Sequence, residues 1–139
     1  MYKPKLEKDI RCPLEYGLDI FGGKWKSRII CVLNFKGTVR YSRLRKDLAN
    51  ITDAVLSASL KELIKDGIIR RKQYDEIPPR VEYSLTDLGK SVLPIFQSIC
   101  RWSSAAAQGD YTAIKLYDSF DSQCARCSRN FTSSGERQQ

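Results

Sequence analysis

Cysteine is the residue type with the most versatile chemistry in this sequence, and one of the five cysteines has a distinctive setting. Cys12 follows Arg11 and immediately precedes Pro13, a residue that is well tolerated in the first turn of a helix. A neighbouring cation and a helix N-terminus both stabilise the thiolate, which is the form that reacts with oxidants and electrophiles. The negative charge of Glu15 has the opposite effect, because it disfavours the thiolate. We therefore predict that Cys12 senses oxidants or electrophiles, with a buried structural thiol as the alternative.

The other four cysteines have less distinctive surroundings. Cys31 lies in an apolar helical stripe, which indicates a side chain of the core. Cys100 lies in a second apolar helix, where it would either pack or serve as the disulfide partner of Cys12. Cys124 and Cys127 form a lone C-x-x-C pair, and the chain contains no histidine that could complete a zinc site. We predict no metal and no cofactor.

Basic residues give the chain a formal net charge of +8, and their placement indicates a polyanionic partner. Residues 20–46 contain eight basic residues and no acidic residue. A second basic group consists of Arg70, Arg71, Lys72 and Arg80. Clustered positive charge on a small chain favours a nucleic acid first and an anionic membrane surface second. Solvated helix faces are the alternative for each cluster taken alone.

Hydrophobic periodicity predicts the elements that would carry these residues. Four helices are expected, at residues 13–21, 24–34, 41–48 and 54–66. Thr52 or Asp53 is a suitable N-cap for the fourth helix, and Gly67 stands where a helix is commonly terminated by glycine. The third and fourth helices are separated by a short turn. Their order predicts a helix-turn-helix.

After Gly67 the apolar period changes from 3.6 residues to two. Residues 69–74 and 81–85 are predicted to be strands of a hairpin, because the two prolines between them cannot donate ladder hydrogen bonds. A long helix is expected over residues 87–106, with Pro94 either kinking it or following a weak first turn. Its apolar residues occupy more than one face, which favours a dimer contact over burial within one domain.

Together these elements predict an α+β fold that is mostly α, a winged helix-turn-helix with a two-stranded hairpin as its wing. We expect an N-terminal arm or short helix at residues 1–12, the DNA-binding domain at 13–106 with its dimerisation helix at 87–106, and a partly disordered extension at 107–139. No apolar run is long enough to span a bilayer and no secretory signal precedes the domain, so we expect a cytoplasmic protein.

Four segments, taken in order, resemble the HxlR family of MarR-like winged helix-turn-helix regulators. They are CPLE at 12–15, GGKWK at 22–26, SLKELIKDGII at 59–69 and PPRVEYSLTDLG at 78–89. The resemblance covers residues 11–103. It implies a homodimeric prokaryotic transcription regulator, most simply a repressor, on a pseudo-palindromic duplex DNA operator. It also implies a recognition helix in the major groove, a wing at the neighbouring minor groove or backbone, and a sensing cysteine at Cys12.

The helix periodicity and this resemblance together nominate DNA-contacting residues. The outward face of the recognition helix would carry five of them: Asp53, Ala54, Ser57, Ala58 and Lys61. This face departs from the family, which commonly has longer polar residues near Ala54 and Ala58, so the preferred bases are in doubt. Phosphate contacts are expected from six basic residues: Arg40, Arg43, Lys46, Arg70, Lys72 and Arg80.

The sequence also allows other functions to be considered. The same dimer could respond to a small aromatic effector in a cleft lined by Tyr16, Phe21, Trp25 and Trp102, although aromatic core is the commoner role. A thiol oxidoreductase using the C-x-x-C pair lacks a βαβ setting and an acid–base histidine, so no enzyme activity is expected. A protein-interaction module without a DNA role conflicts with the acid-free run at residues 20–46.

Overall fold

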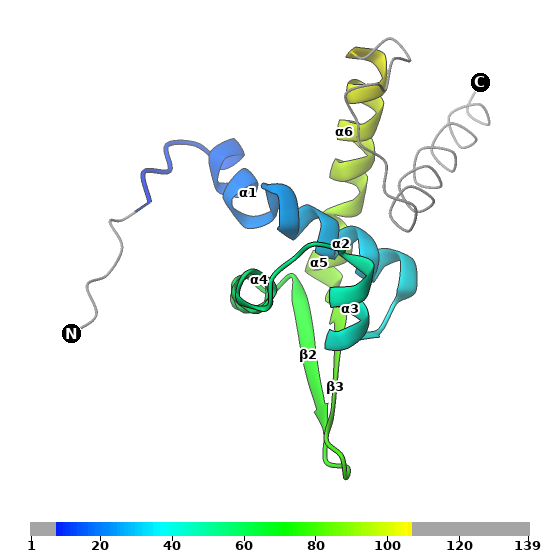
Figure 1. The fold of residues 1–139 in the computed structure, drawn as a ribbon. Helices are drawn as coiled ribbons and strands as arrows, with labels where there is room; N and C mark the ends of the chain where they lie inside the picture. Colours follow the sequence, from blue (N-terminus) through cyan, green and yellow to red (C-terminus); the bar gives the residue numbers. More distant parts are fainter. Residues whose placement is uncertain (1–7, 107–139) are drawn as a thin grey trace.

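The computed structural model of the protein describes residues 8–106 (Figure 1). The expectations for residues 1–7 and 107–139, including those for Cys124 and Cys127, lie outside the described residues. The elements are α1 (Pro13–Phe21), α2 (Lys24–Lys36), β1 (Val39–Arg40), α3 (Tyr41–Asp47), α4 (Asp53–Lys65), β2 (Ile69–Tyr74), β3 (Arg80–Leu85), α5 (Asp87–Ser91) and α6 (Leu93–Ala106). Their order confirms the predicted winged helix-turn-helix.

The helix-turn-helix consists of α3 and α4, and local chemistry sets the limits of α4. Thr52 is the N-cap, and its hydroxyl oxygen accepts a hydrogen bond from the Val55 backbone N–H at 3.2 Å. Beyond the other end, Gly67 has a φ of 75°, in the left-handed region that glycine enters without a steric penalty. The chain is thereby redirected from α4 into β2.

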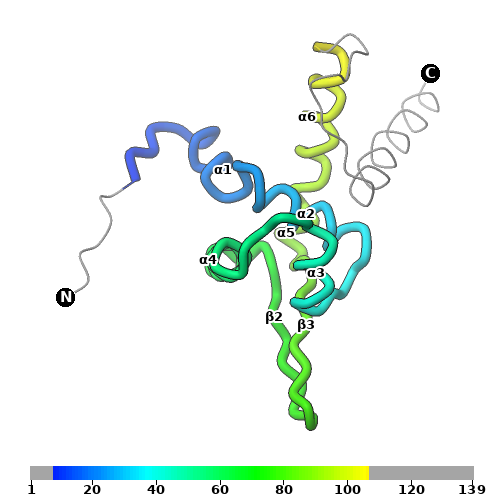
Figure 2. The backbone as a smooth tube through the Cα atoms, viewed as in Figure 1, coloured from blue at the N-terminus to red at the C-terminus, as the bar shows by residue number. Residues whose placement is uncertain are grey.

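The sheet has three strands rather than the two we predicted. The strand order is β1-β3-β2, and both pairings are antiparallel. The predicted hairpin is confirmed as β2 and β3, and it extends away from the helical body (Figure 2). β1 escaped prediction because a two-residue strand has no periodicity of its own and exists only by pairing with β3.

A single apolar core joins the helices to one face of this sheet. α2 contributes Ile29, Ile30 and Leu33, which are almost completely buried. One face of α4 contributes three more buried leucines: Leu56, Leu60 and Leu63. The sheet contributes four buried side chains: Val39, Ile69, Tyr83 and Leu85. Because α4 buries one face here, its opposite face must lie outside.

The helix predicted at residues 87–106 is two helices, with a break at Val92 between α5 and α6. Pro94 is the second residue of α6, where its missing N–H leaves no hydrogen bond unmade. None of the α6 residues is fully buried among the described residues, although Leu93 and Phe96 pack partly against the core. α1 also has no buried residue. Both helices project from the body (Figure 1). In the part of the chain described, no helix has the length and apolar character to cross a bilayer.

A compact junction holds the end of α4, the start of β2 and the start of α5 together. The Thr86 backbone N–H donates to the Ile68 carbonyl at 3.0 Å, and the Thr86 hydroxyl lies 2.5 Å from the Gly67 carbonyl. The Gly89 N–H donates to the same hydroxyl oxygen at 3.0 Å. A Cβ atom at Gly89 would lie 2.2 Å from the Ile68 carbonyl oxygen. Only glycine therefore fits where α5 meets this turn.

We predict that Gly89→Ala destabilises the protein by about 1–3 kcal/mol or more, because a methyl group must displace backbone rather than a flexible side chain. Chemical denaturation followed by circular dichroism measures the effect.

Gly17→Ala is the matched control, because its Cβ would lie 3.6 Å from the Phe21 ring, an ordinary contact within α1. This variant is expected to be stabilised by about 0.5–1 kcal/mol, as alanine is the better helix residue. Equal stability of the two variants would contradict the role assigned to Gly89.

Candidate nucleic-acid interface

The outward face of α4 carries the residues predicted for it. Asp53, Ala54, Ala58 and Lys61 are exposed, and Ser57 is partly buried. Ala54, Ser57 and Ala58 are short, so the first two turns of this face lack the long side chains that form paired hydrogen bonds to base edges. It can, however, approach another surface closely.

A polar network lies at the N-terminal end of α4 and connects it to α3. The Tyr41 hydroxyl oxygen is 3.0 Å from Asp53 Oδ1 and 3.3 Å from Ser57 Oγ. Arg45, in the last turn of α3, brings its Nε to 3.3 Å from the same Asp53 oxygen. The side chains of Arg45 and Asp53 remain more than half exposed, at 53% and 59%. The carboxylate of Asp53 thus lies beside a cation at the molecular surface.

The strand register places four of the predicted phosphate-contacting residues on one face of the sheet. Arg40 and Lys72 both lie opposite Glu82, which aligns the three side chains across the three strands. Arg70 and Arg80 lie two residues along the same strands, so they share that face. Val39 and Tyr83 point to the other face, into the core. The exposed face of the sheet is therefore basic, with one carboxylate at its centre.

Arg80 is held within the hairpin rather than extended into solvent. Its guanidinium carbon lies 3.9 Å from the centre of the Tyr74 ring, and its Nη2 lies 3.2 Å from Glu76. Its Nε is 3.5 Å from Glu82 but forms no hydrogen bond there. Lys72 lies over the same ring at 4.8 Å. Cation–π contacts and ion pairs thus orient the basic side chains of the wing.

The exposed basic residues of α3 are Arg43, Arg45 and Lys46. Arg43 Nε is 3.4 Å from Asp47, which also accepts Lys36 Nζ at 2.7 Å. The Asp47 side chain is only 10% exposed, so its carboxylate connects α2 to α3 from a shielded position. This pairing holds the first helix of the helix-turn-helix against α2.

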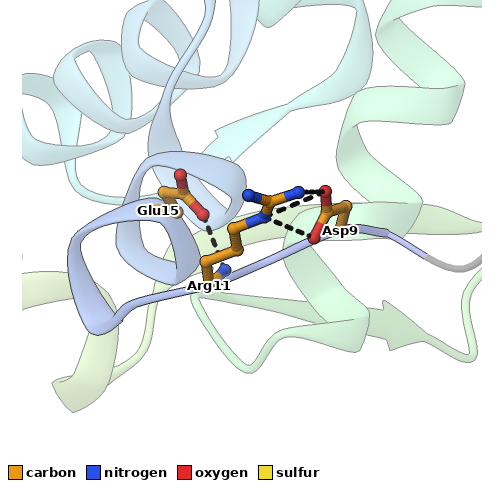
Figure 3. Close-up of polar contacts among 3 residues, drawn as sticks. All are labelled: Asp9, Arg11 and Glu15. Carbon is orange, nitrogen blue, oxygen red and sulfur yellow. Dashed lines mark hydrogen bonds and ion pairs between the residues drawn. The ribbon is translucent and has the colours of Figure 1, made fainter.

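Cys12 is exposed and is the N-cap residue of α1. Arg11, which we expected to act on its thiol, instead donates from Nε and Nη2 to Asp9, at 3.1 Å and 2.9 Å to the nearest oxygens (Figure 3). This hydrogen bonding raises the pKa of Arg11. Glu15 accepts the backbone N–H of Arg11 at 2.6 Å, so its charge is directed at the helix start. The sequence shows that Arg11 and Glu15 are near Cys12, but not which groups they bond to.

Cys12 is the N-cap residue of α1 and Cys100 belongs to α6. The two cysteines are not joined by a disulfide in the structure. Figure 1 shows α1 and α6 as two separate helices. They contact each other through the rings of Phe21 and Phe96, which pack edge to face with centroids 5.4 Å apart.

The sequence matches a known family of regulators. The HxlR-like helix-turn-helix family matches residues 20–111. The chain belongs to the HxlR family. An uncharacterised HTH-type transcriptional regulator of Halalkalibacterium halodurans is 43% identical over 101 residues, which cover 73% of this chain and 89% of that protein.

Solved structures agree with this assignment. The redox regulator HypR in its oxidised form matches with a TM-score of 0.62 at 38% identity, covering 68% of this chain and 96% of that one. The reduced form of the transcriptional regulator YodB of B. subtilis matches with a TM-score of 0.62 at 30% identity, covering 68% and 93%. The HxlR-family chain is thus a helix-turn-helix transcriptional regulator, a class that binds DNA and is not a class of enzymes.

Three residues of this HxlR-family surface were missed by sequence reasoning. Arg45 lies within the acid-free basic run at residues 20–46, where nothing in the sequence distinguishes it from its basic neighbours. The sequence pattern assigns no function to Tyr41 or Glu82. The place of Glu82 among Arg40, Lys72 and Arg80 depends on pairing that joins distant parts of the chain.

The four aromatic residues considered for an effector cleft have different environments. Tyr16 and Trp102 are exposed, at 58% and 72%, whereas Phe21 and Trp25 are partly buried against the core. Lys24 Nζ and the guanidinium carbon of Arg28 lie 4.7 Å and 4.9 Å from the centre of the Trp25 ring. These surroundings give no support to an aromatic effector.

We predict that Arg80→Ala weakens binding to all duplexes alike, because a guanidinium on the basic sheet face would contact phosphate rather than a base. Losing one phosphate contact per protomer makes the log–log salt slope shallower by about 0.9 for each protomer bound. Fluorescence anisotropy over a salt series measures both quantities.

Arg71→Ala is the matched control, since Arg71 is exposed on β2 of the same hairpin but belongs to the opposite face of the sheet. It should change the slope less than Arg80→Ala. A loss confined to one base position, or an unchanged slope after Arg80→Ala, would show that Arg80 makes no phosphate contact.

Proposed function

We propose that this regulator binds a pseudo-palindromic operator as a homodimer and acts as a repressor from the cytoplasm, where the chromosome of a prokaryote lies. The observation that carries the proposal is the orientation of α4. Its leucine face is buried, and its exposed face begins at the polar network of Tyr41, Arg45 and Asp53. In helix-turn-helix proteins the second helix enters the major groove with its N-terminal residues nearest the bases.

The phosphate contacts are proposed to come from two sources that flank α4. Arg40, Arg43 and Lys46 are exposed on and before α3. Arg70, Lys72 and Arg80 share the basic face of the hairpin. Helix and wing contacts of this kind hold a protein in register on the duplex, whereas base contacts supply the sequence preference.

The homodimer is proposed from the apolar surface that α1 and α6 expose. Leu14 and Trp102 are the most exposed, at 69% and 72%, and Leu18, Ile95 and Ile99 are about half exposed. A folded monomer rarely exposes a large contiguous apolar patch, and such patches commonly mark interfaces. We assign α5 and α6, within residues 87–106, to dimerisation, and residues 13–106 to the DNA-binding domain. Two recognition helices then meet half-sites about 34–36 Å apart.

We predict that Trp102→Glu converts the dimer to a monomer, because a charge replaces a large aromatic side chain within the proposed apolar contact. If each protomer neutralises about four phosphates, the log–log salt slope for a selected operator is about −7 for the wild type and about −3.6 for the monomer. Sedimentation velocity and salt-dependent anisotropy provide the two measurements.

Asn34→Glu, which adds the same charge at an exposed position of α2, is the control and should remain dimeric. Wild-type protein that is monomeric at micromolar concentration would refute the homodimer. A flat salt response would refute binding through phosphates.

We further propose that oxidation of Cys12 changes operator binding. Its exposure at the start of α1 and the similarity to the redox regulators HypR and YodB support this role. In the simplest reaction, Cys12 of one protomer and Cys100 of another form a disulfide. The two thiols lose two electrons and two protons to the oxidant, and the azo bond of diamide takes up both and becomes a hydrazine.

We predict that diamide lowers the operator affinity of the wild type by about 5–150-fold, the usual range for coupling between two sites, because a cross-link shifts the spacing of the recognition helices. Cys12→Ser should not respond. Cys31→Ser, which alters a partly buried thiol of α2, is the control and should respond like the wild type. Identical responses of Cys12→Ser and the wild type would eliminate Cys12 as the sensor.

A further inference from the structure

The exposed face of α4 raises the question of which side chain reads the bases. Ala54, Ser57 and Ala58 are too short for the two-point hydrogen bonding that distinguishes one base pair from another. Lys61 lies two turns into the helix, away from the end that approaches base edges most closely. The reader must therefore come from a neighbouring element or from the N-terminal end of α4 itself.

Arg45 occupies the required place. It lies in the last turn of α3, and its Nε is 3.3 Å from Asp53, the first residue of α4. Tyr41 also holds this carboxylate, because its hydroxyl donates to the same oxygen, Asp53 Oδ1, at 3.0 Å. The side chain of Arg45 is 53% exposed even though Asp53 holds it. Arg45 is thus both oriented and accessible.

The chemistry of this arrangement suits a guanine. A guanidinium has five N–H donors, and Arg45 meets Asp53 at its Nε in an ion pair without a hydrogen bond, so the donors of its two Nη groups can serve another partner. Two parallel donors match the O6 and N7 acceptors of guanine in the major groove. The short side chains of Ala54 and Ala58 would allow α4 to lie close enough for an arginine from α3 to reach. Asp53 alone would repel DNA, and its pairing with Arg45 offsets that charge.

We propose that Arg45 reads a guanine in each half-site and that Asp53, supported by Tyr41, is the residue that positions it. This inference rests on the proposed function, because it requires sequence-specific binding to duplex DNA. It adds the side chain that supplies the specificity and the base that is preferred.

The test begins with selection of binding sites from a randomised duplex library by the full-length wild-type protein. The selected operator is expected to contain one guanine per half-site that Arg45→Ala no longer distinguishes. Discrimination against the other bases at that position should fall by about 10–100-fold, the range for one bidentate contact. Asp53→Asn should weaken the same discrimination to a smaller degree, because the guanidinium is then held less firmly.

Arg43→Ala is the matched control, because Arg43 lies on the same helix and its Nε contacts Asp47 at 3.4 Å in a similar way. This variant should lose affinity for all sequences without changing the preferred base at any position. Circular dichroism of the three variants verifies that each is folded, so that a change in base preference reports on recognition.

The outcomes separate the inference from the proposed function. A wild-type protein that selects no consensus would refute sequence-specific binding itself. A consensus whose discrimination is unchanged at every position in Arg45→Ala would overturn the role of Arg45 and leave the proposed function intact. A uniform loss of affinity in Arg45→Ala would also overturn it, because that result identifies a phosphate contact.

Discussion

The structure depends on the burial of one face of α4. Leu56, Leu60 and Leu63 are almost completely enclosed between α2 and the sheet, and this burial fixes the rotation of the helix about its axis. Removing apolar surface from water is the largest favourable contribution to folding, so the rotation is not free to vary. The short polar side chains on the opposite face are consequently held outside. The Thr86 junction then fixes where the hairpin leaves the end of α4.

Carboxylates that lie between the basic residues hold several of the basic side chains in fixed positions. Asp53 holds Arg45, Asp47 holds Arg43 and Lys36, and Glu82 lies among the cations of the sheet. Exposed ion pairs contribute little to stability, because water screens them and long side chains lose freedom. Their larger effect is on geometry. A guanidinium held by a carboxylate on one edge presents its other edge in a defined direction, which is what recognition of a planar partner requires.

Two ends of the molecule have contrasting surfaces. α1 and α6 expose large apolar side chains such as Leu14 and Trp102, whereas α3 and the hairpin expose several basic ones. Lys26 connects the two regions. Its Nζ is 3.2 Å from the Asp19 carbonyl of α1 and 2.5 Å from Glu62 of α4, and its side chain is only 15% exposed. The helix that begins after Cys12 is thus tied to the proposed recognition helix, and a displacement of α1 would act directly on α4.

The sequence alone determined the elements that have local causes. The four helices before the hairpin, the Thr52 cap, the turn at Gly67 and the two long strands follow from apolar periodicity, capping and glycine stereochemistry. The outward residues of α4 follow from the same periodicity. Tertiary structure alone decided the features that join separate segments. The strand β1 forms only by pairing with β3. Arg11 donates to Asp9 rather than acting on the Cys12 thiol. Glu82 lies among basic residues from three strands. The pairing of Arg45 with Asp53 belongs to the same group, because its geometry arises only when two helices pack, and packing depends on the whole core rather than on neighbours in the chain.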